Sequence, residues 1–418
     1  MKRKRAVYLI TIFLVLVGLP ISPSLLGNNG RYAAVRAEPS RHSQEPLSIQ
    51  ERSVQERIEA VQNGLLPPET GNGRPAEMKL GARMAYYKIP GVSIAVINEG
   101  RIEWARGFGV KEAGQDEPVD QYTLFEAGSI SKPVAAMAAM RLVQEGRLNL
   151  DSNVNDRLST WKVPDNQFTR ARKVTLRGLL SHTAGMTVHG FPGYTLGTAV
   201  PSLVEVLNGT SPANTEAIRV DMVPATQWRY SGGGYTVMQL LLIDVTGKRF
   251  PEVLRENVLG RIGMGRSTYE QPLPQAWQPR AATAHDGGRP VKGKWNIYPE
   301  MAAAGLWTTP SDLAQFAIEI QKELAGTSDK VLSSSTARLM VTPVMNGYAL
   351  GLGIDGAGDA ARFGHNGVDF GFEALMVAYE KTGQGAVIMT NGVGGQALCS
   401  EIIRGVARVY HWSGYPMR

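Results

Sequence analysis

The sequence predicts an α+β fold, because strand patterns occur towards both ends of the folded region and helical patterns fill its middle. Alternating apolar residues at 92–97 and 101–110 flank a short polar turn, which is typical of an antiparallel hairpin with one buried face. Further strand patterns lie at 348–354, 373–379 and 386–390. Few such patterns occur between about 150 and 290. We therefore expect one sheet built from both ends of the chain, with a helical insertion between them.

Helical patterns account for most of the other predicted elements. They cover 49–61, 129–145, 175–181, 235–246 and 397–409. The Ala-rich pattern over 129–145 stops at Gly146, and the pattern over 235–246 stops at Gly247, a residue type that commonly ends helices. Another helix is expected to begin at 309–312, where Pro stands in the first turn and Asp lies near the positive helix end.

The N-terminal residues 1–37 have the pattern of a secretory signal. They contain six Lys or Arg and no acidic residue, and an apolar run at 6–21 follows four consecutive basic residues. This run of 16 residues is shorter than the roughly 20 that span a bilayer, so we favour cleavage over a permanent anchor. We expect an exported protein, periplasmic or extracellular, that meets the membrane only through residues 6–21 if they are retained.

The rest of the chain divides by composition. Residues 38–75 are rich in Pro, Gly, Gln and charge, which predicts a linker with a peripheral helix. Residues 76–418 are assigned to one domain. Its α/β part is expected at 76–150 and 291–418, and its helical part at 151–290.

Charge and rare residues exclude several function classes. Of 44 Lys and Arg, six lie in residues 1–37, which leaves 38 against 37 acidic residues, so no nucleic-acid partner is expected. The single Cys399 excludes an internal disulfide and thiolate metal clusters. The six His are scattered without a His-Glu-x-x-His motif, so neither metal nor cofactor is expected. A Gly-x-Ser-x-Gly elbow is also absent, which argues against an α/β-hydrolase.

Ser129 and Lys132 form a candidate nucleophile and proton acceptor. They stand three residues apart at the start of a helix, so they share a face, and an amine next to a hydroxyl can take its proton. Lys is a poor base in water, so the pair requires a cleft. A helix cap and an ordinary first-turn lysine would give the same pattern. A second Ser-x-x-Lys at 159–162 lies in a polar loop, where nothing holds its ends together.

Two later segments could complete such a site. Tyr230 precedes three glycines that follow Ser231, so its phenol and the nearby backbone could approach a ligand closely. In the segment around His365, Gly367 would let a substrate lie along a strand, with the N–H of Val368 facing a developing oxyanion. Taken singly, a core tyrosine and a structural histidine would be the more common explanations of these residues. We expect His182 and His189 to serve loop structure.

Five segments in order resemble the serine β-lactamase and penicillin-binding protein superfamily. They lie at 125–132, 179–186, 230–247, 305–313 and 364–367. Within it the sequence is most similar to the class C β-lactamase group, which includes related D,D-carboxypeptidases, D-aminopeptidases and family VIII esterases. The resemblance runs from about residue 87 to the C-terminus. It implies an antiparallel sheet flanked by helices, joined to a mainly helical domain with the site between them.

The resemblance also implies roles for individual residues. Ser129 would be the nucleophile, Lys132 the proton shuttle and Tyr230 the phenol of the Tyr-x-Asn motif. The substrate would meet the remaining motif positions, which are Gly232, His365, Asn366, Gly367 and Val368. The oxyanion hole would consist of the backbone N–H groups of Ser129 and Val368.

Two departures from the motifs bear on the substrate. Gly232 replaces the Asn that grips a substrate amide, and His365 replaces a Lys, as in the His-x-Gly version of some D,D-peptidases and aminopeptidases. A neutral imidazole attracts a carboxylate less than an ammonium does, so inefficient β-lactam hydrolysis is expected. The sequence therefore predicts an exported serine hydrolase with an acyl-enzyme mechanism on a small-molecule ester, amide or peptide. The alternative is a non-catalytic module that binds penicillin or cell-wall peptides. Loops 186–225 and 268–300 are expected to shape the pocket.

Overall fold

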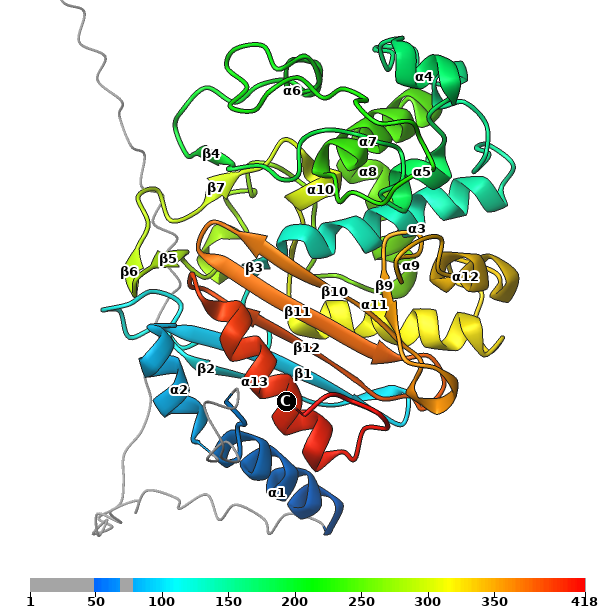
Figure 1. Cartoon of the computed structure of the whole chain (residues 1–418). Coiled ribbons are helices and arrows are strands. Elements are labelled where there is room, and N and C mark those ends of the chain that lie inside the picture. Colours follow the sequence, from blue (N-terminus) through cyan, green and yellow to red (C-terminus); the bar gives the residue numbers. More distant parts are fainter. Residues whose placement is uncertain (1–48, 68–77, 418) are drawn as a thin grey trace, which may run out of the picture. The chain divides into compact units, whose positions relative to one another are not determined.

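A six-stranded antiparallel sheet organises the part of the chain that the computed structural model describes, residues 49–67 and 78–417 (Figure 1). The strand order is β2-β1-β12-β11-β10-β9. These strands are β1 (Gly91–Asn98), β2 (Arg101–Gly109), β9 (Gly353–Asp355), β10 (Arg362–Asp369), β11 (Phe372–Tyr379) and β12 (Gly385–Thr390). Because β1 pairs with β12, segments near both ends of the described chain build one sheet. The predicted α+β fold is confirmed.

The hairpin of β1 and β2 follows its predicted pattern. Its strands pair from Gly91 opposite Gly109 to Asn98 opposite Arg101, with a register irregularity in between. The turn residues Glu99 and Gly100 both have positive φ, as tight hairpin turns require. Side chains along β1 alternate between the two buried faces of the sheet, which makes β1 a fully internal strand.

Helices cover both faces of the sheet. On one face lies α13 (Gly395–Val409), which packs against α1 (Ile49–Asn63) and α2 (Leu80–Tyr87) (Figure 1). On the other face lies α11 (Pro310–Leu324), with α12 (Ser334–Val341) beside it. The predicted helices at 49–61 and 397–409 and the helix start at 309–312 are confirmed, since the Thr309 side chain caps α11 at the N–H of Asp312.

A helical layer packs around α3 (Ser131–Gln144) on the α11 side of the sheet. Its other helices are α4 (Gln167–Ala171), α5 (Leu176–Leu180), α6 (Leu203–Asn208), α7 (Gly232–Thr246), α8 (Phe250–Leu254), α9 (Gly260–Ile262) and α10 (Met301–Ala304). Three short strand pairs brace the connections: β3 (Phe125–Glu126) with β8 (Trp307–Thr308), β4 (Tyr194–Thr195) with β7 (Asn296–Ile297), and β5 (His285–Asp286) with β6 (Arg289–Pro290). One continuous apolar core joins this layer to the sheet.

Two elements differ from the prediction. The strand predicted over 348–354 is wrong for most of its length, because Gly351 adopts a positive φ and only β9 pairs with β10. Conversely, the segment that holds His365 is a full strand of eight residues, β10. Its two glycines weaken the strand pattern in the sequence, although β10 pairs with β11 along its whole length.

The predicted signal segment 1–37 lies outside the described residues, and the predicted linker 38–75 is described only over 49–67. Among the helices that the structure describes, none combines the length and apolar character needed to cross a bilayer.

A buried ion pair fixes α2 against α13. Arg83 donates to both carboxylate oxygens of Glu401 at 2.6 and 2.5 Å, and Tyr87 Oη donates to the same carboxylate at 2.7 Å. The Glu401 side chain has no exposed surface and that of Arg83 is 8% exposed. Such a pair matters to stability mainly because each buried charge has an opposite charge beside it, so that neither is left uncompensated.

Removal of one partner should therefore cost more than removal of both. We expect Arg83→Met to lower the free energy of unfolding by about 3–5 kcal/mol, because the Glu401 carboxylate loses its cation. The double variant Arg83→Met/Glu401→Leu should lose clearly less. Urea denaturation of the single and double variants measures this coupling. Equal losses in both would contradict a buried charge effect.

Candidate active site

Ser129 and Lys132 meet at the start of α3. Ser129 lies in a 3₁₀ turn, Gly128–Ile130, and Lys132 lies in the first turn of the α-helix that follows. Lys132 Nζ donates to Ser129 Oγ at 2.9 Å and to the carbonyl of Ala303 at 2.8 Å. Lys132 is only 2% exposed, whereas Ser129 is half-buried and reachable. The structure thus brings this predicted pair into direct contact.

The second Ser-x-x-Lys segment makes no such pair. Lys162 Nζ donates to the carbonyls of Asn155 and Leu158. The backbone N–H of Ser159 donates to the carboxylate of Asp244 at 2.7 Å. Both ends of the motif therefore serve the local loop structure, which separates it from the motif at 129–132.

Tyr230 joins the pair from the start of α7. Lys132 Nζ lies 4.9 Å from the centroid of the Tyr230 ring. The three glycines after Ser231 form the first turn of α7, which begins earlier than predicted because the Ser231 side chain caps it at the N–H of Gly234. A hydroxyl, an amine and a phenol from separate parts of the chain thus meet in one place.

His182 lies behind Tyr230. Its ring centroid is 4.2 Å from that of Tyr230, and its Nδ1 accepts a hydrogen bond from the N–H of Ser231 at 3.1 Å. Burial, and next the charge of Lys132, hold the pKa of His182 well below its usual value. The imidazole is therefore neutral, and because Nδ1 is an acceptor its proton lies on Nε2. His182 both orders the loop and supports the phenol.

His365 is also neutral. Burial lowers its pKa to about 3, with a smaller contribution from the charge of Lys132. Its Nδ1 contacts the carbonyl of Asn366, and its Nε2 lies 3.0 Å from Tyr348 Oη. With Nδ1 donating to the carbonyl, Nε2 accepts from the tyrosine. Sequence reasoning missed Tyr348, because nothing near position 348 signals a polar contact with β10.

Side chains alternate along β10, which decides what each motif residue can offer. His365, Gly367 and Asp369 are buried, whereas Asn366 and Val368 are exposed on the other face of the strand. Asn366 and Val368 therefore present their side chains on a different face of β10 from His365.

The backbone of β10 lies directly against the turn that holds Ser129. A Cβ added to Gly367 would lie 1.9 Å from the carbonyl oxygen of Ala127 and 3.3 Å from the nitrogen of Ser129. A Cβ added to Gly128, which has φ of +52°, would lie 2.5 Å from the nitrogen of Val368. Only glycine allows this approach. The nitrogens of the predicted oxyanion hole thus belong to two backbone segments in close contact.

Three carboxyl groups are buried near the site and were missed by sequence reasoning. Burial raises the pKa of Glu126 and Asp369 well above their usual values, and it raises that of Glu300 to about 8. Both oxygens of Glu126 and of Glu300 lack a hydrogen-bond partner within the protein. Glu126 lies just before the segment 129–132 and Asp369 just after the segment 365–368. In the sequence both look like ordinary surface acids. In the part of the chain that the structure describes, no three His, Cys, Asp or Glu side chains are placed to hold a metal ion.

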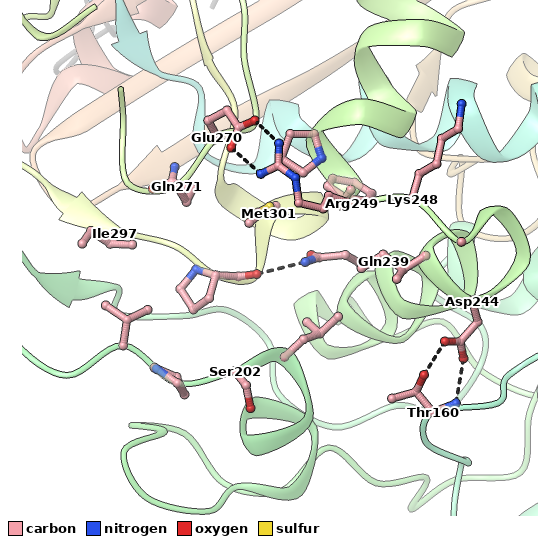
Figure 2. A pocket seen from close by; sticks show the side chains of 18 of the residues that line it. Thr160, Ser202, Gln239, Asp244, Lys248, Arg249, Glu270, Gln271, Ile297 and Met301 are labelled. Carbon is pink, nitrogen blue, oxygen red and sulfur yellow. Dashed lines mark hydrogen bonds and ion pairs between the residues drawn. The ribbon is translucent and has the colours of Figure 1, made fainter. Parts of the chain in front are cut away.

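A cavity of about 720 Å³ is lined by residues of α7 and α8 and by Met301 at the start of α10 (Figure 2). Both loops that were expected to shape the pocket line it, and β4 of the first loop pairs with β7 of the second. Ser129, Lys132 and Tyr230 do not line this cavity. Gln239 lines this cavity, and its side-chain amide donates to the carbonyl of Pro299 and accepts from the N–H of Ala302. Through α10 the cavity therefore adjoins the carbonyl of Ala303 that binds Lys132.

The raised pKa of Glu300 predicts a loss of stability in alkali. A carboxyl that stays protonated in the folded protein but ionises when unfolded stabilises the fold fully below about pH 4.5, and this stability is lost as the pH rises to about 8. Relative to Glu300→Gln, which cannot ionise, the wild type should lose roughly 4 kcal/mol between pH 4.5 and 8.5. Urea midpoints of both proteins across this range test it. A difference that does not change with pH would contradict the assignment.

Comparisons with known proteins agree with this geometry. The family model described as Beta-lactamase matches residues 77–407. Penicillin-binding protein 4 of Amycolatopsis lactamdurans is 25% identical over 338 residues, which cover 76% of this chain and 85% of that protein. Protein flp of Staphylococcus aureus strain MW2 is 25% identical over 317 residues, which cover 72% of this chain but only 60% of that protein.

Solved structures share the fold at lower identity. The octameric penicillin-binding protein homologue from Pyrococcus abyssi superposes with a TM-score of 0.64 at 22% identity, covering 81% of this chain and 76% of its own. A beta-lactamase/D-alanine carboxypeptidase from Yersinia pestis, complexed with citrate, gives a TM-score of 0.62 at 17% identity, covering 78% of this chain and 95% of its own. With its family match over most of its length, this chain belongs to the beta-lactamase family, within the superfamily of serine β-lactamases and penicillin-binding proteins.

Proposed function

We propose that this protein is an exported serine hydrolase that forms an acyl-enzyme on Ser129. The observation that carries the proposal is the contact of 2.9 Å between Ser129 Oγ and a lysine amine that is itself buried. A hydroxyl in contact with a positioned base is the arrangement that activates serine as a nucleophile. Export is supported by the basic and apolar pattern of residues 1–37.

The geometry supports acyl transfer in two steps. Ser129 Oγ attacks the carbonyl carbon of an ester or amide, and its proton passes to the amine of Lys132. Lys132 and Tyr230 then deliver a proton to the leaving group, and water releases the acyl group from Ser129 by the reverse transfer. Negative charge on the carbonyl oxygen would be met by the N–H groups of Ser129 and Val368.

The neutral state of His365 bears on the substrate class. An imidazole with a pKa of about 3 carries no charge at neutral pH, so it gives a substrate carboxylate little attraction. Gly232 has no side chain that could form a hydrogen bond with an amide in the acyl portion of the substrate. Both features favour esters or simple amides over β-lactams.

A second candidate function is supported by Gly232. A protein that keeps the nucleophile but lacks the amide grip would bind penicillin or cell-wall peptides without efficient turnover. Penicillin-binding protein 4, a relative at 25% identity, bears a name that fits this alternative. A chromogenic cephalosporin, short p-nitrophenyl esters and D-amino acid amides separate the two functions, because only a hydrolase turns any of them over repeatedly.

The nucleophile itself is tested by covalent labelling. The wild type should react with a fluorophosphonate or a labelled penicillin at Ser129, and Ser129→Ala should not react. Peptide mass mapping identifies the labelled residue. Equal labelling of both proteins would exclude Ser129.

We expect Lys132→Ala to slow fluorophosphonate labelling of Ser129 by about 10²–10⁴-fold, because a positioned base contributes that much to proton transfer. The matched control is Lys162→Ala in the other Ser-x-x-Lys segment, which should label at the wild-type rate. Circular dichroism checks that both variants fold. Similar slowing in both variants would remove the assigned role of Lys132.

Tyr230→Phe keeps the ring beside Lys132 and removes only the hydroxyl. We expect kcat/KM for an ester to fall by about 10–100-fold with little change in stability, because the variant loses a proton relay but no packing. Tyr122→Phe, at a tyrosine that is 45% exposed, serves as the control. An unchanged kcat/KM in Tyr230→Phe would show that the phenol plays no part in proton transfer.

A further inference from the structure

The segment 187–191 fills the space beside Gly232. A Cβ added to Gly232 would lie 2.9 Å from Cε2 of Phe191 and 3.1 Å from the carbonyl oxygen of His189. A protein interior has no room for a longer side chain at such a point unless the neighbours move. An asparagine at position 232 and the present position of the Phe191 ring therefore exclude each other.

Backbone hydrogen bonds fix the segment in this place. The N–H of Gly232 donates to His189 O at 2.9 Å, and the N–H of Gly233 donates to Val188 O at 3.0 Å. Val188 itself has a φ of +62°, a conformation that β-branched residues rarely adopt. Strained residues of this kind persist where the surrounding structure holds them, and they concentrate at functional sites.

This arrangement presents His189 at the site. Its ring centroid lies 4.9 Å from that of Tyr230, and the residue is exposed. His182, the other imidazole against Tyr230, is only 2% exposed. A molecule that approaches Tyr230 from solvent therefore meets His189 and the half-buried ring of Phe191 where the motif would offer an amide.

We propose that the segment 187–191 determines substrate specificity, with His189 in contact with the acyl portion of the substrate and Phe191 bounding its space. The proposal rests on the acyl-transfer function above and names its substrate class, which is esters with a short apolar acyl group. An asparagine amide offers a donor and an acceptor side by side and can pair with an amide of the substrate, whereas an imidazole carries its nitrogens on different edges of the ring. An acyl chain with its own amide would leave that amide unpaired, which is costly. An apolar acyl group gains contact with Phe191 instead.

Two esters with the same leaving group test the proposal: p-nitrophenyl butyrate and the p-nitrophenyl ester of N-acetyl-D-alanine. The wild type should prefer the butyrate by about 10-fold or more in kcat/KM, as one unpaired polar group implies. His189→Ala should raise KM for the butyrate about 5-fold while kcat changes less than about twofold, which marks a binding contact. His411→Asn, at an exposed histidine on the C-terminal side of α13, is the matched control and should change neither constant.

A second pair of variants tests the mutual exclusion. Gly232→Asn alone should lose most ester activity, because its side chain displaces Phe191. Phe191→Ala/Gly232→Asn should regain activity and shift the preference towards the N-acetyl-D-alanine ester by about 10-fold relative to the wild type. Phe191→Ala alone should not produce this shift. If the double variant fails to fold, the KM of His189→Ala for p-nitrophenyl butyrate still tests the proposal.

Labelling separates failure of this proposal from failure of the proposed function. If a fluorophosphonate does not label Ser129 in the wild type, the acyl-transfer function falls and the specificity proposal falls with it. If Ser129 is labelled but the wild type shows no preference for the butyrate, only the specificity proposal is overturned. An unchanged KM in His189→Ala would overturn it equally.

Discussion

The burial of the Lys132 amine between the Ser129 hydroxyl and the Ala303 carbonyl is the contact on which the site depends. It joins Lys132, at the start of α3, to Ala303 of α10, which lies 171 positions later in the chain. Both hydrogen-bond partners of this buried amine belong to the protein, so its geometry follows from the packing of α3 and α10. The four alanines of α3 at 135, 136, 138 and 139 are fully buried, and their small size lets neighbouring segments approach the helix closely.

Five buried titratable side chains near this contact have pKa values shifted towards their uncharged forms. Burial lowers the pKa of His182 and of His365, and it raises the pKa of the carboxyls of Glu126, Glu300 and Asp369, so it favours the uncharged form of each group. In the proposed mechanism, the backbone N–H groups of the turn at Ser129 and of β10 would then stabilise the developing negative charge.

The sequence predicts the local parts of this arrangement and misses the distant ones. The pairing of Ser129 with Lys132 follows from helix periodicity, and the hairpin of β1 and β2 follows from strand alternation. Nothing in the sequence identifies the Ala303 carbonyl or Tyr348 as partners, because such contacts arise only when separate elements pack. β10 escaped the strand pattern because its glycines serve close approach, and Gly351 broke a strand that hydrophobicity alone suggested. The tight packing of Phe191 on Gly232 was equally invisible, since it depends on two loops meeting.

The pairing of β1 with β12 has a consequence for how the protein is made. β1 is complete at residue 98, yet one of its edges stays open until residues 385–390 have left the ribosome. Its contacts are among the most distant in the sequence, and pairing of this kind closes slowly. The nascent chain therefore spends nearly all of its synthesis without a finished sheet, and the backbone of β10 joins Ser129 only near the end of translation.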